Sequence, residues 1–135
     1  MHELEIEAKI DNLTEVLAFV EEKLHEIGCD EAKMIQIDIA VEEIFVNIAH
    51  YAYNPKIGYA QIKVDVIPDP LQVCLTFIDH GMPYDPLARE DPDINLPLEE
   101  RKIGGLGIFM VKNSMEDLQY EYKDGMNILS FKKSI

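Results

Sequence analysis

Cysteine is scarce in this chain of 135 residues, which contains only two. Cys29 follows an expected helix and Cys74 lies in an apolar segment, and neither belongs to a CxxC pair or stands near a group of histidines. Cysteines of this kind are typical of reduced structural thiols in a reducing compartment. They indicate neither a disulfide framework nor a metal site.

Basic residues and long apolar runs are scarce as well. The chain has 12 Lys and Arg against 26 Asp and Glu, a formal net charge of −14. Phosphate would be repelled across most of such a surface, which argues against direct binding to nucleic acid or to an anionic membrane. No apolar run approaches the length of a membrane span, and the segment "MHELEIEAKI" lacks the apolar centre of a signal peptide. We therefore expect a soluble, cytoplasmic protein whose acidity either maintains solubility or docks a basic protein partner.

The apolar residues that are present make up 47% of the chain. This fraction is ordinary for a globular protein, and the length suits one domain with one core. We therefore predict a single domain over residues 1–135.

The chain alternates between strand-like and helix-like patterns. Apolar and acidic residues alternate from about residue 3, as in a strand with one wet face. Two helices are expected next, the first ending at Gly28 and the second running from Asp30 to about Tyr53. The runs "YAQIKVDVI" and "LQVCLTFID" read as strands, residues 108–115 as a helix, and "LQYEYKDGMNILSFKKS" as a hairpin that turns at Asp124 and Gly125. This order predicts an α+β two-layer sandwich, in which a mixed, mostly antiparallel sheet carries helices on one face.

The second helix combines an apolar stripe with polar residues that need an explanation. At 3.6 residues per turn the stripe should face the sheet, and it comprises Met34, Ile37, Val41, Ile44, Phe45, Ile48 and Ala52. Opposite to it lie Gln36, Glu43, Asn47 and His50. Glu43 and Asn47 are four residues apart and therefore adjacent, whereas Glu42 points away from them. A carboxylate beside a carboxamide offers oxygen ligands that suit Mg²⁺ bound to phosphate, although a solvated helix face would show the same residues.

The end of the second apolar strand is a further candidate for ligand binding. The strand "LTFID" delivers Asp79 at its end, where a carboxylate could accept a hydrogen bond from an exocyclic amine. Gly81 would let a flat ring approach the backbone there, although Asp and Gly also suit a simple β-turn.

The segment "KIGGLGIFMVKN" places Gly104, Gly105 and Gly107 directly before an apolar helix, whose N-terminus favours phosphate. It matches neither the dinucleotide nor the Walker pattern, and a hinge with a helix cap is the alternative. The long, proline-containing loop before it, from Gly81 to Gly107, is of a length that is usually functional.

Together these motifs resemble the GHKL superfamily of ATPases. Within it, the segments "VEEIFVNIAHYAY", "DHGMPYDP" and "GGLGIFMVKNSMEDLQYEYKDGMN" are most similar to the stand-alone anti-sigma-factor serine kinases of bacteria. The resemblance extends from about residue 3 to residue 133.

The resemblance implies a Bergerat (GHKL) ATP-binding fold and a role for each matching residue. Asn47 would bind Mg²⁺, which bridges the phosphates of ATP, and Glu43 would be the general base for a serine hydroxyl or for water. Asp79 would bind the adenine amine, with Gly81 beside the ring, and His50 also fits the pattern. An ATP lid would span about 86–103. The phosphates would be held by the lid's end and the helix start, which contain Arg101, Lys102, Gly104, Gly105, Leu106, Gly107 and Ile108.

The resemblance also implies a biological role. The protein would bind ATP and Mg²⁺, sequester a sigma factor, and phosphorylate a serine of a STAS-type antagonist protein, and it would form a homodimer. Family members place a late arginine in the lid for the γ-phosphate, and here neither Arg101 nor Lys102 has the usual spacing from the glycines. A non-catalytic ATP-binding regulator and a slow ATP hydrolase therefore remain the alternative functions.

Overall fold

The computed structural model describes residues 2–53, 56–88 and 106–135, and these form one five-stranded sheet and three α-helices. The strands are β1 (His2–Glu7), β2 (Tyr59–Ile67), β3 (Gln72–Asp79), β4 (Glu116–Lys123) and β5 (Met126–Ser134). The helices are α1 (Leu13–Glu26), α2 (Glu31–Asn47) and α3 (Leu106–Ser114), and a short π-helical segment, Ile48–Ala52, continues α2.

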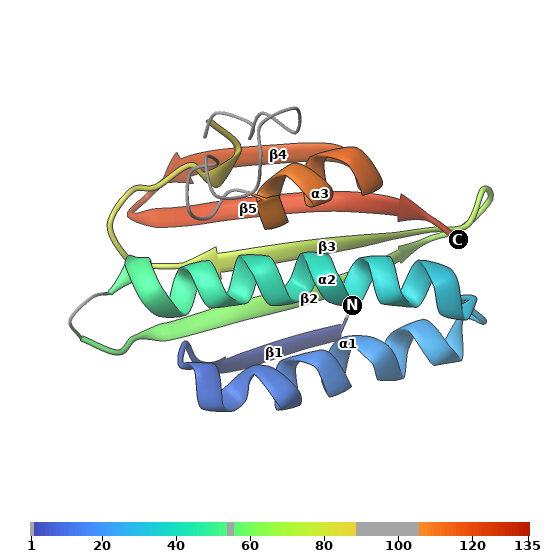
Figure 1. Cartoon of the computed structure of the whole chain (residues 1–135), viewed down its shortest axis with the longest axis horizontal. Helices are drawn as coiled ribbons and strands as arrows, with labels where there is room; N and C mark the ends of the chain where they lie inside the picture. Colours follow the sequence, from blue (N-terminus) through green and yellow to red (C-terminus); the bar gives the residue numbers. More distant parts are fainter. Residues whose placement is uncertain (1, 54–55, 89–105) are drawn as a thin grey trace, which may run out of the picture.

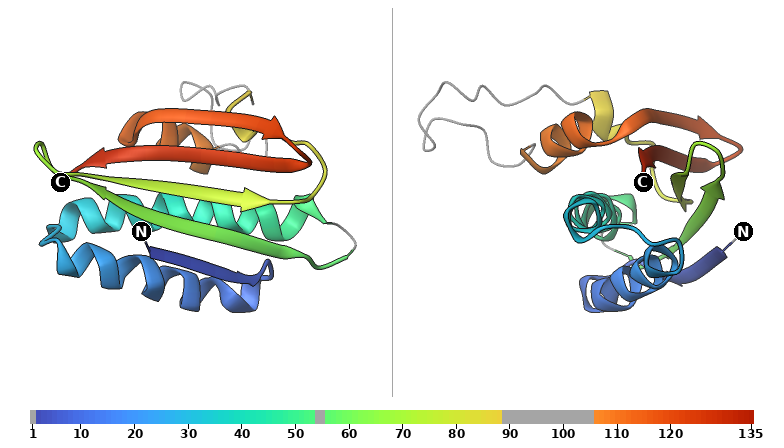
Figure 2. Two further views of the ribbon diagram at one scale, coloured as in Figure 1. Left: turned by 180° about the vertical axis from the view of Figure 1, so that it is seen from behind. Right: turned by 90° about the vertical axis from the view of Figure 1, so that its right-hand side faces the viewer.

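The sheet has the strand order β1-β2-β3-β5-β4, and each neighbouring pair is antiparallel. The helices cover one face of this sheet, with α2 lying along its middle (Figure 1). The edge-on view in Figure 2 shows α1, α2 and α3 on the same side. The predicted α+β two-layer sandwich is therefore confirmed.

The core lies between the two layers. Each central strand buries alternate residues against the helices, as period-two patterning requires. The inward residues of β2, β3 and β5 include Ile62, Val64, Leu75, Phe77, Leu129 and Phe131. The predicted apolar stripe of α2 is buried along its whole length, from Met34 to Ala52. This burial fixes which side of α2 faces away from the sheet.

The expected element boundaries are set by local backbone chemistry. Gly28 ends the α1 region with a φ of +74°, a conformation that glycine adopts without a Cβ penalty. The side chain of Asp30 caps α2 by accepting from the backbone N–H of Lys33 at 2.8 Å. Asp124 and Gly125, with φ of 53° and 78°, form the predicted hairpin turn. No helix within the described ranges is both long and apolar enough to cross a membrane.

Candidate nucleotide-binding site

Glu43 and Asn47 lie side by side on α2, as the helical spacing predicts. Both side chains are half-buried, and Nδ2 of Asn47 donates to Oε1 of Glu43 at 3.4 Å. Glu42 is exposed. The helix therefore separates two adjacent glutamates into one that is exposed and one that is partly enclosed.

The start of α3 packs directly against Glu43. A Cβ atom added at Gly107 would lie 2.1 Å from Oε2 and 2.2 Å from Cδ of Glu43. Only a residue without a side chain allows this approach, so the glycine brings the first turn of α3 against the carboxylate. Ile108, the next residue, is buried and anchors this turn to the interior.

Asp79 is the last residue of β3, and its side chain is buried, with 5% exposed. Its Oδ1 accepts two hydrogen bonds at 2.9 Å, one from the backbone N–H of Gly81 and one from Nδ2 of Asn127 on β5. A buried carboxylate needs such donors, because desolvation without them is costly. Asp79 is thus held in one orientation.

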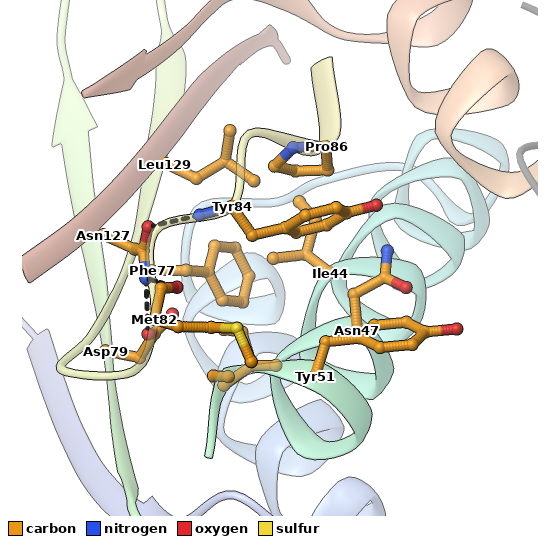
Figure 3. Close-up of a pocket in the computed structure, with 12 residues that line it drawn as sticks. Ile44, Asn47, Tyr51, Phe77, Asp79, Met82, Tyr84, Pro86, Asn127 and Leu129 are labelled. Carbon is orange, nitrogen blue, oxygen red and sulfur yellow. Dashed lines mark hydrogen bonds between the residues drawn. The ribbon is translucent and has the colours of Figure 1, made fainter. Parts of the chain in front are cut away.

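A pocket between α2 and the sheet is lined by both Asn47 and Asp79 (Figure 3). It is open to solvent on one side, and its empty space, with the open part included, is about 420 Å³. Asp79 and Asn127 lie on its sheet side and Asn47 and Tyr51 on its α2 side. The other lining residues are Ile44, Ile48, Ala52, Phe77, Met82, Tyr84, Pro86 and Leu129. A flat apolar group with one polar edge directed toward Asp79 suits these walls.

Gly81 has a structural reason for being glycine that the sequence did not reveal. A Cβ atom there would lie 2.2 Å from the carbonyl oxygen of Ala52. The same carbonyl accepts from the backbone N–H of Met82 at 2.9 Å. Gly81 therefore joins the loop after β3 to the end of the helix, and it does not line the pocket.

His50 lies outside the pocket, whereas its neighbour Tyr51 lines it. His50 is exposed, and its ring meets the ring of Tyr51 edge-on at 6.0 Å between centroids. The signal was present in the sequence, because residue 51 continues the four-residue spacing of Glu43 and Asn47.

Asn127 was also missed, although its position is informative. It shares the inward face of β5 with Leu129 and Phe131, where an amide among apolar residues indicates a specific partner. That partner is Asp79, which is 48 positions earlier in the chain.

Several predicted residues lie outside the described ranges. These are Arg101, Lys102, Gly104 and Gly105, together with most of the predicted lid; of the lid only a 3₁₀ turn, Pro86–Ala88, is described. Leu106 is the first residue of α3.

The donor set suits a magnesium–nucleotide complex better than a metal held by protein alone. Within residues 2–53, 56–88 and 106–135, no group of three His, Cys, Asp or Glu side chains is placed so that it could hold a metal ion. Asn47 donates to Glu43 through Nδ2, so the Oδ1 atom of Asn47 remains available as an acceptor. One oxygen ligand from the protein is enough for Mg²⁺, which takes most of its ligands from water and phosphate.

The chain is also similar to a known domain family and to named bacterial proteins. A model of the histidine kinase-like ATPase domain matches residues 6–133. A serine-protein kinase RsbW of Bacillus cereus (strain ATCC 10987 / NRS 248) is 27% identical over 134 residues, which is 96% of this chain and 82% of that protein. The serine-protein kinase RsbW of Bacillus mycoides (strain KBAB4) is 25% identical over the same shares.

Proposed function

This chain belongs to the histidine kinase-like ATPase domain family, and on that premise we propose that it binds ATP and Mg²⁺ in the pocket between α2 and the sheet. One observation carries the proposal. Asn47 from α2 and Asp79 from β3 line the same pocket, and Gly107 of α3 contacts Glu43, which is hydrogen-bonded to Asn47. Three distant segments of the chain thus meet at one place.

The base would occupy the inner part of the pocket. Ile44, Phe77 and Leu129 offer apolar surface to a flat ring, and the carboxylate of Asp79 would accept from the exocyclic amine of adenine. Gly81 would help by keeping the loop after β3 close to the helix. The carboxylate is already oriented by its two donors, so little order would be lost on binding.

The phosphates would extend toward α3. The first backbone N–H groups of a helix have no partner within the helix, so the turn at Leu106, Gly107 and Ile108 suits an anion. Asn47 would give one oxygen to Mg²⁺, which would neutralise phosphate charge. By the family resemblance, the lid would span about 86–103, and Arg101, Lys102, Gly104 and Gly105 would belong to the phosphate site.

We further propose that the protein is a serine kinase. Glu43 would accept the proton of the attacking serine hydroxyl while the γ-phosphoryl group is transferred to its oxygen, leaving ADP. Its position supports this role, because the contact with Gly107 places the carboxylate beside the proposed phosphate site. The relatives named as serine-protein kinases support the same reading.

By the same resemblance, the phosphorylated protein would be a STAS-type antagonist, and a dimer of this chain would sequester a sigma factor when the antagonist is modified. A reaction with ATP labelled at the γ-phosphate tests ATP use and phosphoryl transfer. We expect label on a serine of the antagonist encoded by a neighbouring gene. Release of the label as free phosphate alone would indicate a hydrolase, and ATP binding without turnover would indicate a non-catalytic regulator.

A further inference from the structure

Asn127 connects the loop after β3, the edge strand β4 and Asp79. Its Nδ2 donates to Oδ1 of Asp79 and to the carbonyl oxygen of Met82, both at 2.9 Å. Its Oδ1 accepts from the backbone N–H of Tyr84 at 3.2 Å and from the hydroxyl of Tyr120. Both hydrogens and both lone pairs of the amide are therefore used within the protein.

These contacts fix the orientation of the amide. The positions of nitrogen and oxygen in an Asn or Gln amide are assigned from its hydrogen-bond partners. Here an acceptor (the carbonyl of Met82) faces Nδ2, and a donor (the N–H of Tyr84) faces Oδ1. The hydroxyl of Tyr120, which is protonated at neutral pH as phenols are, is a further donor to Oδ1. Asn127 must therefore present a hydrogen, rather than an oxygen, to Asp79.

This arrangement limits what Asp79 can accept. A carboxylate oxygen has two lone pairs, and Oδ1 of Asp79 uses both, for Gly81 and for Asn127. Among the described residues no hydrogen bond reaches Oδ2. Asp79 therefore offers a ligand in the pocket only one free carboxylate oxygen, Oδ2. A carboxylate without these two donors would offer both oxygens.

The difference matters for purines. The polar edge of adenine has one donor, the amine, beside the acceptor N1. Guanine has two adjacent donors, N1–H and the 2-amine, which a carboxylate with two free oxygens pairs together. Where one oxygen is already occupied, the second donor of guanine stays unpaired in a buried site, and this is costly.

We propose that Asn127 determines the choice of adenine over guanine by occupying Oδ1 of Asp79. The inference rests on the proposed nucleotide function. Asn127 itself would make no hydrogen bond to the base, because its hydrogen-bonding capacity is spent on the protein. It acts as a specificity-determining residue through Asp79.

The test compares ATP and GTP affinities of the wild-type protein, Asn127→Ala and Tyr120→Phe by calorimetry. In Asn127→Ala the ratio of the two affinities should move toward GTP by roughly tenfold or more, as for a hydrogen bond to a charged group. Tyr120→Phe is the matched control, because it removes one contact of Asn127 and leaves both donors to Asp79 in place; its ratio should stay that of the wild type. A purely structural role would weaken both nucleotides equally in Asn127→Ala, and an unchanged ratio there would overturn the inference while leaving ATP binding intact.

A measurement on the wild-type protein covers the case in which Asn127→Ala does not fold. ITP differs from GTP by lacking the 2-amine, so it has only the N1–H donor. With one oxygen of Asp79 available, GTP should bind no more tightly than ITP, within about threefold, and both should bind far more weakly than ATP. GTP binding much tighter than ITP would show that Asp79 accepts two donors and would refute the role of Asn127. Failure of the wild-type protein to bind ATP at all would instead overturn the proposed function, and this inference with it.

Discussion

At the scale of single residues, two adjacent glutamates on α2 have different surroundings. Glu43 is hydrogen-bonded to Asn47 and covered by Gly107, whereas Glu42 is exposed. The two residues are of the same type and adjacent on the same helix. Any functional difference between them must therefore come from the direction in which each side chain points.

This contrast gives a matched pair of substitutions. Glu43→Gln keeps the size of the side chain and can still pair with Asn47, but it cannot take a proton. We expect ATP affinity to be retained and phosphoryl transfer to fall by roughly a hundred- to ten-thousand-fold. Glu42→Gln should leave both unchanged. Calorimetry and transfer of labelled phosphate measure the two steps, and loss of transfer in Glu42→Gln alone would refute the assignment of the base.

The sequence predicted the residues that follow simple periodicity and missed those that depend on tertiary contact. The pairing of Glu43 and Asn47 followed from helical spacing, and so did the burial of the apolar stripe. Asn127 could not be connected to Asp79, because its partner is set by the pairing of β3 with β5. Gly81 was expected to face a ligand, yet its nearest neighbour is the backbone of Ala52.

At the scale of secondary-structure elements, two glycines join helices to their surroundings in different ways. The missing Cβ of Gly107 faces the carboxylate end of a flexible side chain, Glu43. The missing Cβ of Gly81 faces the backbone and Cβ of Ala52. A side-chain end can move aside, whereas a packed backbone cannot do so without shifting the loop or the end of the helix.

Replacing glycine by alanine should therefore affect activity at one site and stability at the other. Gly107→Ala should fold with a melting temperature close to that of the wild type but lose transfer, because Glu43 is displaced. Gly81→Ala should lower stability by about 1–3 kcal/mol, the usual range for an inserted methyl group in a packed site. Thermal unfolding and transfer assays on both variants separate the two effects. Equal loss of stability would contradict the distinction between side-chain and backbone contact.

The contact between α1 and α2 contains a carboxyl pair that should respond to pH. Burial, a hydrogen bond to Glu21 of α1 and the nearby charge of Glu42 raise the pKa of Asp38 to about 7, and its Oδ1 has no hydrogen-bond partner within the described residues. Because the folded state holds this proton more tightly than the unfolded state, the contribution to stability falls as pH rises from about 4 to about 7 and stays low above that.

The asparagine of the Asp38→Asn variant cannot ionise, so the variant should not lose stability as this carboxyl loses its proton. We expect the melting temperature of the variant to exceed that of the wild type at pH 8, with a smaller difference at pH 5. A gain in melting temperature for Asp38→Asn that is larger at pH 5 than at pH 8 would contradict the raised pKa of Asp38.

At the scale of the whole molecule, the fold was the most predictable property. Alternating and helical periods placed each element, and turn residues such as Gly28 and Gly125 placed the boundaries. The order of strands in the sheet could not be read in the same way, since it depends on which strands pair across long sequence separations. The pocket exists because this order places β3 and β5 side by side under α2.

Nucleotide binding should be visible as stabilisation of the whole domain. A ligand that binds only the folded state at 100 times its Kd stabilises by about 2.7 kcal/mol, which raises the melting temperature of a chain this size by roughly ten degrees. We expect this increase with ATP and Mg²⁺ together. It should shrink when EDTA is added, and also in Asn47→Ala, which removes the proposed ion ligand. An undiminished increase in Asn47→Ala would exclude Asn47 as that ligand.

One of the two edge strands of the described sheet, β4, also bears on how the protein avoids aggregation. Its pairing with β5 shifts between Glu116 and Gln119, and Asp117 in this irregular stretch has a positive φ of 48°. Charged side chains, among them Glu121 and Lys123, are exposed along the strand. An irregular, charged edge is a poor template for a strand of another chain, because the free backbone groups are out of register and the charges would have to be desolvated. Fibril-like growth of the sheet across β4 is therefore disfavoured, and so is a dimer that continues the sheet at this edge.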